Sequence, residues 1–239
     1  MTTVAEIPEE TAPRELPRAV LFDWDNTLVD SWGCIHAAIN ATLTWADLPE
    51  WSIDETRARV RRSLRDSFPA LFGDRWEMAR DVYYAEFEAR HLETLTPLPG
   101  AGDLLAALES SGIYMGVVSN KTGRFLRAEA DALGWTRYFG RLVGATDAAA
   151  DKPASEPVHL ALQPAGLRPG PDVWFVGDAD IDMQCAHATG CLPLLVGQSD
   201  DVFGTFAPAH RFANCFMMSR LVLELIDTIS HESVAGSTK

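Results

Sequence analysis

The chain has 239 residues, of which 47% are hydrophobic and 23% are charged, so it is long enough to bury a full core and has an ordinary globular composition. Its formal net charge of -14 argues against nucleic acids and anionic membranes as partners. No apolar run approaches the roughly 18 residues of a membrane span, and no basic segment followed by an apolar one opens the chain, so we expect neither a membrane span nor a signal peptide.

The N-terminal part of the chain predicts a tail followed by a buried strand. Residues 1–17 are rich in Pro, Glu and Thr and lack an apolar period, which is typical of a mobile tail. The apolar run at 19–23 predicts a strand, and its end carries Asp23 and Asp25, whose spacing of two places both carboxylates on one side of an extended backbone. Buried like charges resist ionising together, and a divalent cation removes that cost. A strand-end turn with two solvated carboxylates remains the alternative at this stage.

The segment after this strand predicts a compact, all-helical insert over residues 32–97. A helical pattern starts directly after the strand, and Ser52 followed by Glu55 forms a capping box that predicts a second helix. A third helix is expected over 74–95, where the apolar residues form one stripe. The sequence PLPGAG at 97–102 is a Pro/Gly signal that predicts a hinge at the end of the insert.

Strand and helix patterns alternate through the rest of the chain. Strands are expected at 113–119, 141–146, 172–177 and 193–197, with a short apolar run near 211–216, and helices at 101–111, 122–133, 154–167, 180–189 and 219–229. This alternation predicts an α/β fold with a parallel sheet covered on both faces, a three-layer Rossmann-like core. The core would comprise residues 18–31 and 98–230, with the small helical cap, 32–97, inserted after the first strand and a second tail at 231–239.

Polar residues gather where the predicted strands end, and ligands of such sheets bind at these carboxyl ends. The residues concerned are Asp23, Asp25, Ser119, Asn120, Asp178 and Asp182. Asp178 and Asp182 are four apart at the expected start of a helix and so share a face; with Asp23 they would form a cluster of the hard oxygen ligands that Mg²⁺ prefers. Ser119 offers a hydroxyl and a backbone N–H to an oxyanion, and Lys152, in a loop that leads into a helix, is a point cation suited to a phosphoryl group.

The segments DWDNTL, VVSN, DKP and GDADID, in this order, resemble the four motifs of the haloacid dehalogenase-like hydrolase superfamily. The helical insert resembles the small cap of the phosphoglycolate phosphatase-like branch. This resemblance implies a magnesium-dependent phosphatase that hydrolyses a small phosphorylated metabolite, phosphoglycolate-like or a sugar phosphate, through an aspartyl-phosphate. Asn26 stands where the family usually has Gly, and because Asn tolerates positive φ we expect the turn to form.

The resemblance also implies a role for each matching residue. Asp23 would be the nucleophile that attacks phosphorus, and Asp25 would protonate the leaving oxygen and then accept a proton from water. The implied ligands of Mg²⁺ are Asp23, the backbone carbonyl of Asp25, Asp178 and, directly or through water, Asp182. The residues that would bind the phosphoryl oxygens or offset their charge are Ser119, Asn120 and Lys152. These roles require the carboxylates of Asp23 and Asp178 to lie within about 5 Å of each other.

Residue chemistry narrows the choice among relatives. The carboxylate of Asp25 argues against a dehalogenase, since a leaving halide needs no proton. The insert 32–97 contains no lysine, which argues against a relative that forms a Schiff base. A sugar phosphomutase, which would protect the aspartyl-phosphate from water, stays open, as does a non-catalytic binding module. Either a monomer or a homodimer fits the sequence.

An arginine-rich segment of the insert, RARVRRSLR at 57–65, carries two interpretations. Read as one helix, it places Arg57, Arg61 and Arg65 in a like-charged stripe, which is either a solvated basic face or part of the site. In the second interpretation Arg62 or Arg65 reaches over the pocket to an anionic leaving group. Closure of the cap would then use hinges near Ser31 and at 97–100.

Other conspicuous residues receive structural interpretations. Lys121, one of three lysines in the chain, is expected on the solvated surface, and Asp180 is expected to cap the helix that follows it. Trp24 should point away from Asp23 and Asp25 and pack against a helix. The six histidines show no metal-ligand spacing. The four cysteines form no C-x-x-C pair and predict reduced, buried thiols in a cytoplasmic protein.

Overall fold

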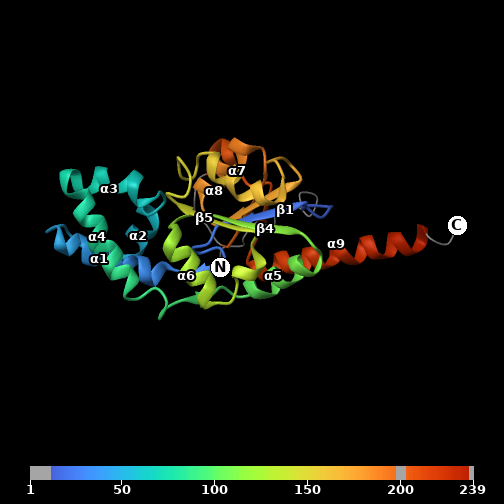
Figure 1. Cartoon of the computed structure of the whole chain (residues 1–239), viewed down its shortest axis with the longest axis horizontal. Helices are drawn as coiled ribbons and strands as arrows, with labels where there is room; N and C mark the ends of the chain where they lie inside the picture. Colours follow the sequence, from blue (N-terminus) through green and yellow to red (C-terminus); the bar gives the residue numbers. More distant parts are fainter. Residues whose placement is uncertain (1–11, 198–202, 237–239) are drawn as a thin grey trace, which may run out of the picture.

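The computed structural model describes residues 12–197 and 203–236, with side chains described up to residue 228 (Figure 1). A parallel sheet lies at its centre, in the strand order β5-β4-β1-β6-β7-β8. The strands are β1 (Ala19–Phe22), β4 (Tyr114–Thr122), β5 (Arg141–Ala145), β6 (Val173–Gly177), β7 (Leu192–Val196) and β8 (His210–Phe212). This confirms the predicted α/β class, because all five pairings are parallel and four of them connect strands that are separated by α-helices along the chain.

Helices cover both faces of the sheet and make it the middle of three layers (Figure 1). One face carries α5 (Ala101–Ser110), α6 (Gly123–Ala132) and α9 (Cys215–Gly236), and the other carries α7 (Glu156–Leu162) and α8 (Asp180–Thr189). Strand β1 shows why both faces need cover, since all four of its residues are completely buried. Val20 and Phe22 face the first layer, and Ala19 and Leu21 face the second.

The helix that ends the chain differs from the prediction at both ends. We expected a helix over 219–229, whereas α9 begins at Cys215 and continues to Gly236, within the predicted tail at 231–239. Figure 1 shows that its C-terminal half projects beyond the sheet. Of the N-terminal tail, 1–17, residues 1–11 lie outside the described residues. None of the described helices is both long enough and apolar enough to cross a membrane.

Four helices lie together at one end of the molecule, beside the carboxyl ends of the strands (Figure 1). They are α1 (Trp32–Trp45), α2 (Ile53–Arg59), α3 (Leu64–Phe72) and α4 (Trp76–Glu88). Their buried side chains form a hydrophobic cluster of their own, to which the core contributes Phe125. All four fall within residues 32–97, the predicted cap, whose exact boundaries stay a prediction. The capping box at Ser52 and Glu55 is confirmed, because each side chain accepts a hydrogen bond from the other residue's backbone N–H.

Helix α3 was not expected as a separate element. The chain leaves the helical conformation after Arg59 and a new helix starts after Ser63, so the arginines at 57–65 do not form one helical stripe. Pro69 lies inside α3 and removes a backbone hydrogen bond, which obscures the helical pattern in the sequence. Tertiary packing compensates for that loss: Phe68 forms an edge-to-face contact with Tyr83 of α4, with ring centroids 5.7 Å apart.

Two short strands mark the passage between the helical group and the sheet. Strand β2 (Val29–Asp30) pairs antiparallel with β3 (Thr96–Pro97), so the chain segments that enter and leave the helical group lie side by side. The remaining short elements are single 3₁₀ turns at Gly73–Arg75, Thr136–Tyr138, Gln163–Ala165 and Gly204–Phe206. The expected hinge positions, near Ser31 and at 97–100, flank this two-stranded ribbon.

Candidate active site

Three carboxylates meet at the carboxyl ends of β1 and β6. Asp23 directly follows β1, Asp178 directly follows β6, and Asp182 lies in the first turn of α8. One oxygen from each of the three lies within 4.8 Å of the others, which agrees with the expected separation of about 5 Å between Asp23 and Asp178. A cluster of three hard oxygen donors at this spacing fits a divalent cation, and it fits a buried site without a cation poorly because the like charges repel.

The way Asp178 and Asp182 come together differs from the prediction. They do not share a helix face, because α8 begins only at Asp180 and Asp178 lies in the preceding turn. Asp180 is not the N-cap either: that position is Ala179, and the Oδ2 of Asp182 accepts the hydrogen bond of its N–H at 3.1 Å. Gly177 permits this arrangement, since a Cβ there would lie 2.3 Å from the Cγ of Asp182. Only glycine fits at this position while Asp182 stays in place.

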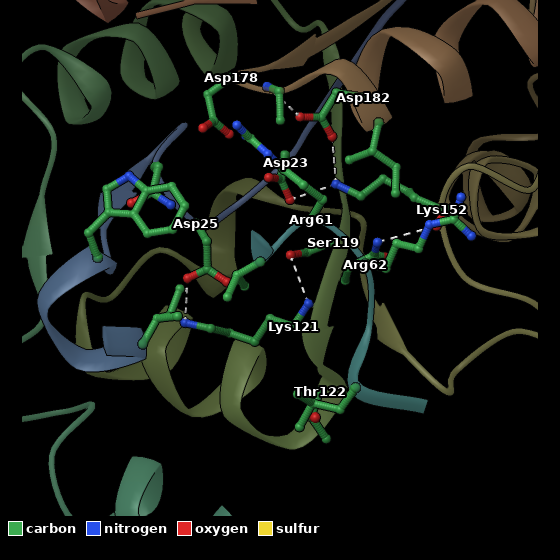
Figure 2. Close-up of a pocket in the computed structure, with 18 of the residues that line it drawn as sticks. Asp23, Asp25, Arg61, Arg62, Ser119, Lys121, Thr122, Lys152, Asp178 and Asp182 are labelled. Carbon is green, nitrogen blue, oxygen red and sulfur yellow. Dashed lines mark hydrogen bonds and ion pairs between the residues drawn. The ribbon is translucent and has the colours of Figure 1, made fainter. Parts of the chain in front are cut away.

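Lys152 forms ion pairs with two of the three carboxylates, those of Asp23 and Asp182 (Figure 2). Its Nζ lies 2.8 Å from Oδ1 of Asp23 and 2.7 Å from Oδ1 of Asp182, and its side chain is only 2% exposed. The lysine reaches them from the loop before α7, as the sequence predicts. A buried ammonium is stable only when it is paired, and here two carboxylates supply the compensating charge.

Burial and mutual repulsion dominate the electrostatics of the cluster. Burial raises the pKa of Asp23 to about 6; Lys152 opposes this shift, and Asp182 and Asp25 add to it. The pKa of Asp178 is raised well above its usual value, first by burial and then by Asp182 and Asp23. Burial lowers the pKa of Lys152, but its two carboxylate neighbours outweigh burial and the net shift is upward. When the three carboxylates are ionised they carry more negative charge than Lys152 neutralises, and their raised pKa values reflect that cost, which favours a cation as an additional partner.

The turn that follows β1 contains Asn26 and Thr27, and Thr27 forms a hydrogen bond with Asp178 at the end of β6. Asn26 adopts φ +60°, so the expectation that Asn replaces Gly in a left-handed turn is confirmed. Its Oδ1 accepts a hydrogen bond from the N–H of Ser31, which closes the turn. The hydroxyl of Thr27 donates to Oδ1 of Asp178 at 3.3 Å. This threonine is completely buried and is a site contact that we did not predict from the sequence.

Ser119 and Asn120 lie where β4 passes the cluster. Strand β4 continues to Thr122, so Ser119 stands within the strand and not at a strand-to-helix turn as expected. The hydroxyl of Ser119 is buried and accepts a hydrogen bond from the N–H of Lys121. Asn120 donates from Nδ2 to the carbonyl of Lys152 at 3.2 Å, while its buried Oδ1 has no partner among the described residues. Both residues line the same pocket as Asp23, Asp25 and Lys152, and Figure 2 shows Ser119 there.

The prediction for Lys121 is wrong. This residue is buried and not solvated, because β4 is longer than expected and carries the side chain inward. Its Nζ lies 2.7 Å from Oδ1 of Asp25 (Figure 2) and 2.6 Å from Oε2 of Glu129. Glu129 lies eight residues further along the chain, on α6. Its contact with Lys121 depends on how α6 packs against β4, so the spacing of the two residues in the sequence does not predict it.

The cap side of the pocket is apolar with two arginines. Arg61 and Arg62, in the linker between α2 and α3, line the same pocket as the carboxylates (Figure 2). The apolar lining residues from the helical group are Trp32, Ile35, Val60, Leu64, Tyr83 and Phe87. Arg62 thus lines the pocket, and its contact with a leaving group stays a prediction. Arg65 does not line this pocket.

Arg65 instead joins the helical group to the core. Its Nε and Nη2 each lie 2.6 Å from an oxygen of Asp151, the neighbour of Lys152. The carboxylate of Asp151 is 1% exposed and also accepts a hydrogen bond from the N–H of Thr146. A two-point contact between a guanidinium and a buried carboxylate is among the stronger ionic interactions in proteins.

Replacing Arg65 by Met should therefore lower the free energy of unfolding by about 2–3 kcal/mol, because it leaves Asp151 buried without its cation. Urea unfolding of the two proteins measures this difference. The matched control is Arg57→Met, which breaks an exposed ion pair with Asp54 and should cost less than about 1 kcal/mol. Equal losses in the two variants would contradict the assigned strength of the Arg65 contact.

Comparison with known proteins places this site in context. The sequence model described as "Haloacid dehalogenase-like hydrolase" matches residues 20–196. Phosphoglycolate phosphatase 1 of Pseudomonas aeruginosa is 31% identical over 194 residues, which cover 76% of this chain and 71% of the relative. The crystal structure of a Had-superfamily hydrolase from Ehrlichia chaffeensis has a TM-score of 0.62 and 29% identity, with 90% of this chain and 100% of that chain covered. A haloacid dehalogenase-like family protein from Streptococcus pneumoniae shares the fold, with a TM-score of 0.74, 24% identity and coverage of 90% and 98%.

Proposed function

The chain belongs to the haloacid dehalogenase-like hydrolase family and is a phosphoric monoester hydrolase, and on this premise we propose that it cleaves a small phosphorylated metabolite through an aspartyl-phosphate, with Mg²⁺ as cofactor. The observation that supports this most directly is the position of Asp23, which lines the pocket, contacts Lys152 and lies within 4.8 Å of oxygens of Asp178 and Asp182. As the matched relative is a phosphoglycolate phosphatase, we propose a phosphoglycolate-like or sugar phosphate as substrate.

In the first step of the proposed reaction, a carboxylate oxygen of Asp23 attacks phosphorus and the bond to the leaving oxygen breaks. Lys152 contacts Oδ1 of Asp23, so we assign the attack to Oδ2. Asp25 gives a proton to the leaving oxygen, which departs as an alcohol. In the second step water attacks phosphorus and Asp25 accepts a proton from this water. The bond between phosphorus and the Asp23 oxygen breaks, which releases phosphate and restores the free carboxylate of Asp23.

The residues around Asp23 stabilise the charge that moves through these steps. Lys152 lies against the nucleophile and offsets the charge of the phosphoryl group, while the hydroxyl of Ser119 and the amide of Asn120 face the same pocket and bind phosphoryl oxygens. The residues that would hold Mg²⁺ are Asp23, the backbone carbonyl of Asp25, Asp178 and Asp182. Asp182 would act through water, because Lys152 and the N–H of Ala179 already occupy its oxygens. When bound, the cation would neutralise these carboxylates and the phosphoryl oxygens.

The helical group supplies the part of the site that selects the leaving group. We propose that residues 32–97 act as a cap that closes over the pocket and excludes water, with the β2–β3 ribbon at its hinge. In the closed arrangement Arg62 contacts an anionic group of the substrate, and the aromatic and aliphatic lining packs beside it. We also propose a cytoplasmic setting, because all four cysteines are free thiols.

Phosphate release from p-nitrophenyl phosphate and from a panel of phosphate monoesters, phosphoglycolate included, tests this function. We expect turnover with Mg²⁺ and a loss of at least about 10²-fold after removal of divalent cations by EDTA. The cation should also raise the melting temperature, because it binds only the folded site, and its affinity should weaken below about pH 6, where Asp23 becomes protonated.

The variant Asp178→Asn should weaken both effects of the cation, since it removes one of the three clustered carboxylates. Turnover that is unchanged by EDTA would contradict a metal-dependent reaction. A sugar phosphomutase would instead isomerise a sugar phosphate and release little phosphate, so the panel separates this alternative from a phosphatase.

A further inference from the structure

A buried network of side chains adjoins Asp25 and has no part in the chemistry described above. Lys121 is its centre: the side chain is 4% exposed, and its Nζ lies 2.7 Å from Oδ1 of Asp25. The same Nζ donates to both oxygens of Glu129, at 2.7 and 2.6 Å. An ammonium has three N–H groups, and these three contacts use all of them. The direction in which Lys121 faces Asp25 is therefore fixed by Glu129.

Glu129 is itself held in place by two further donors. The indole N–H of Trp24 donates to its Oε2 at 2.7 Å, and Nδ1 of His91 lies 2.9 Å from its Oε1. Trp24 is the residue between Asp23 and Asp25; it is completely buried and packs edge-to-face on Trp135. It packs in the core cluster that includes side chains of α5 and α6, and it is connected to Asp25 through Glu129 and Lys121. Two neighbours in sequence, Trp24 and Asp25, are thus both connected to Glu129, the first directly and the second through Lys121.

The helical group closes the network from the cap side. His91 follows α4 within residues 32–97, and the ring of Phe87 on α4 lies over Lys121, with Nζ 5.0 Å from the ring centroid. Burying a lysine and a glutamate together costs a desolvation penalty, and a pair of apolar residues of the same volume is often as stable. A role limited to stability thus gives little reason for this charged pair at the edge of the pocket.

We propose that Lys121 is a positioning residue for Asp25, held by Glu129 so that one oxygen of Asp25 is fixed on the ammonium and the other is presented to the leaving oxygen of the substrate. This inference rests on the proposed function, in which Asp25 is the general acid. Because Glu129 accepts hydrogen bonds from the same ammonium and carries a compensating charge, Lys121 can orient Asp25 without placing an unbalanced cation beside it. The proposal concerns orientation, and misplacement of a reacting group by about 1 Å can cost about 10²-fold in rate.

The test is the dependence of kcat/KM on the leaving group, since this ratio reports the steps up to phosphoryl transfer to Asp23. An alkyl phosphate needs a proton on its leaving oxygen, whereas p-nitrophenolate leaves without one. We expect Lys121→Met to lower kcat/KM for an alkyl phosphate by about 10²-fold and to leave that for p-nitrophenyl phosphate nearly unchanged. In an Asp25→Ala background the same substitution should have no further effect, because Lys121 acts through Asp25.

Two further variants keep the test decisive. The double variant Lys121→Met with Glu129→Gln removes the buried lysine and glutamate charges together, so Glu129 is not left as a buried charge without its cation. It carries the test if the single variant does not fold, and it should show the same selective loss. Leu108→Ala removes a buried side chain of α5 away from the pocket; it should lower stability and leave the ratio of the two substrates unchanged. Equal losses for both substrates in the Lys121 variants, or no loss for either, would overturn the inference. A wild-type protein inactive on both substrates would overturn the proposed function itself.

Discussion

Asp23→Asn should abolish phosphate release, with kcat reduced by about 10⁴-fold or more. The amide has the shape of the carboxylate but is a poor nucleophile, so the aspartyl-phosphate cannot form. The fold should survive the change, because burial raises the pKa of Asp23 to about 6, so at pH 7 its negative charge is less stable in the folded chain than in the unfolded one, and removing that charge should not lower the free energy of unfolding. Lys152 keeps Asp182 as its partner. Steady-state phosphate release and thermal unfolding of the same preparation measure the two effects.

Asp180→Asn is the matched control for this substitution. Asp180 belongs to the same acidic segment, yet it lies on α8 and its Oδ2 accepts a hydrogen bond from the side chain of Gln184. The change from Asp to Asn there should leave kcat within about threefold of wild type, because it removes no group that touches the phosphoryl site. Retention of activity in Asp23→Asn, with the folded state intact, would show that another residue attacks phosphorus.

Most of the fold and the centre of the site could be predicted because they depend on short-range signals. A strand such as β1 is apolar on both faces and is buried on both, so its sequence has no other stable placement. Once the sheet is parallel, the carboxyl ends of its strands share one edge, and Asp23 and Asp178 must come close although they lie far apart in the chain. The turn at Asn26 follows from the φ preference of a single residue.

The contacts that could not be predicted join residues whose distance is set by tertiary packing. Lys121 was expected in solvent, since its neighbours in sequence give no sign that α6 brings Glu129 to it. Arg65 lacks an acidic residue at helical spacing and finds Asp151, which lies in another part of the chain. In both cases the partner of a charge is decided by how helices pack on the sheet, and local pattern carries no information about that choice.

Helix α3 shows the same limit for secondary structure. Pro69 argues locally against a new helix, but burial of Phe68 and Phe72 against α4 outweighs the lost backbone hydrogen bond. The consequence for the site is direct, because the break before α3 places Arg61 and Arg62 in a linker beside the pocket and not on a solvated helix face.

Asp25→Ala should lower kcat by about 10²–10⁴-fold while the enzyme still becomes phosphorylated. With p-nitrophenyl phosphate the first step needs no proton from Asp25, so we expect a burst of about one p-nitrophenolate per enzyme, followed by slow turnover. The second step is slow because no base accepts the proton of the attacking water. Lys121 keeps its contacts with Glu129 after the substitution, so the fold should be retained. Rapid-mixing absorbance measurements follow the burst.

The phosphoenzyme that accumulates in Asp25→Ala also identifies the nucleophile. After acid quenching and proteolysis, the phosphate should be found on the peptide that contains Asp23, and the double variant Asp23→Asn with Asp25→Ala should carry none. A phosphorylated peptide that lacks residue 23 would contradict the assignment of the nucleophile, whereas a variant with neither burst nor label would place Asp25 in the first step for every substrate. The two acids are separated by one residue and face one pocket, yet loss of the first prevents the covalent intermediate and loss of the second preserves it, which is the difference expected between a nucleophile and a proton-transfer group.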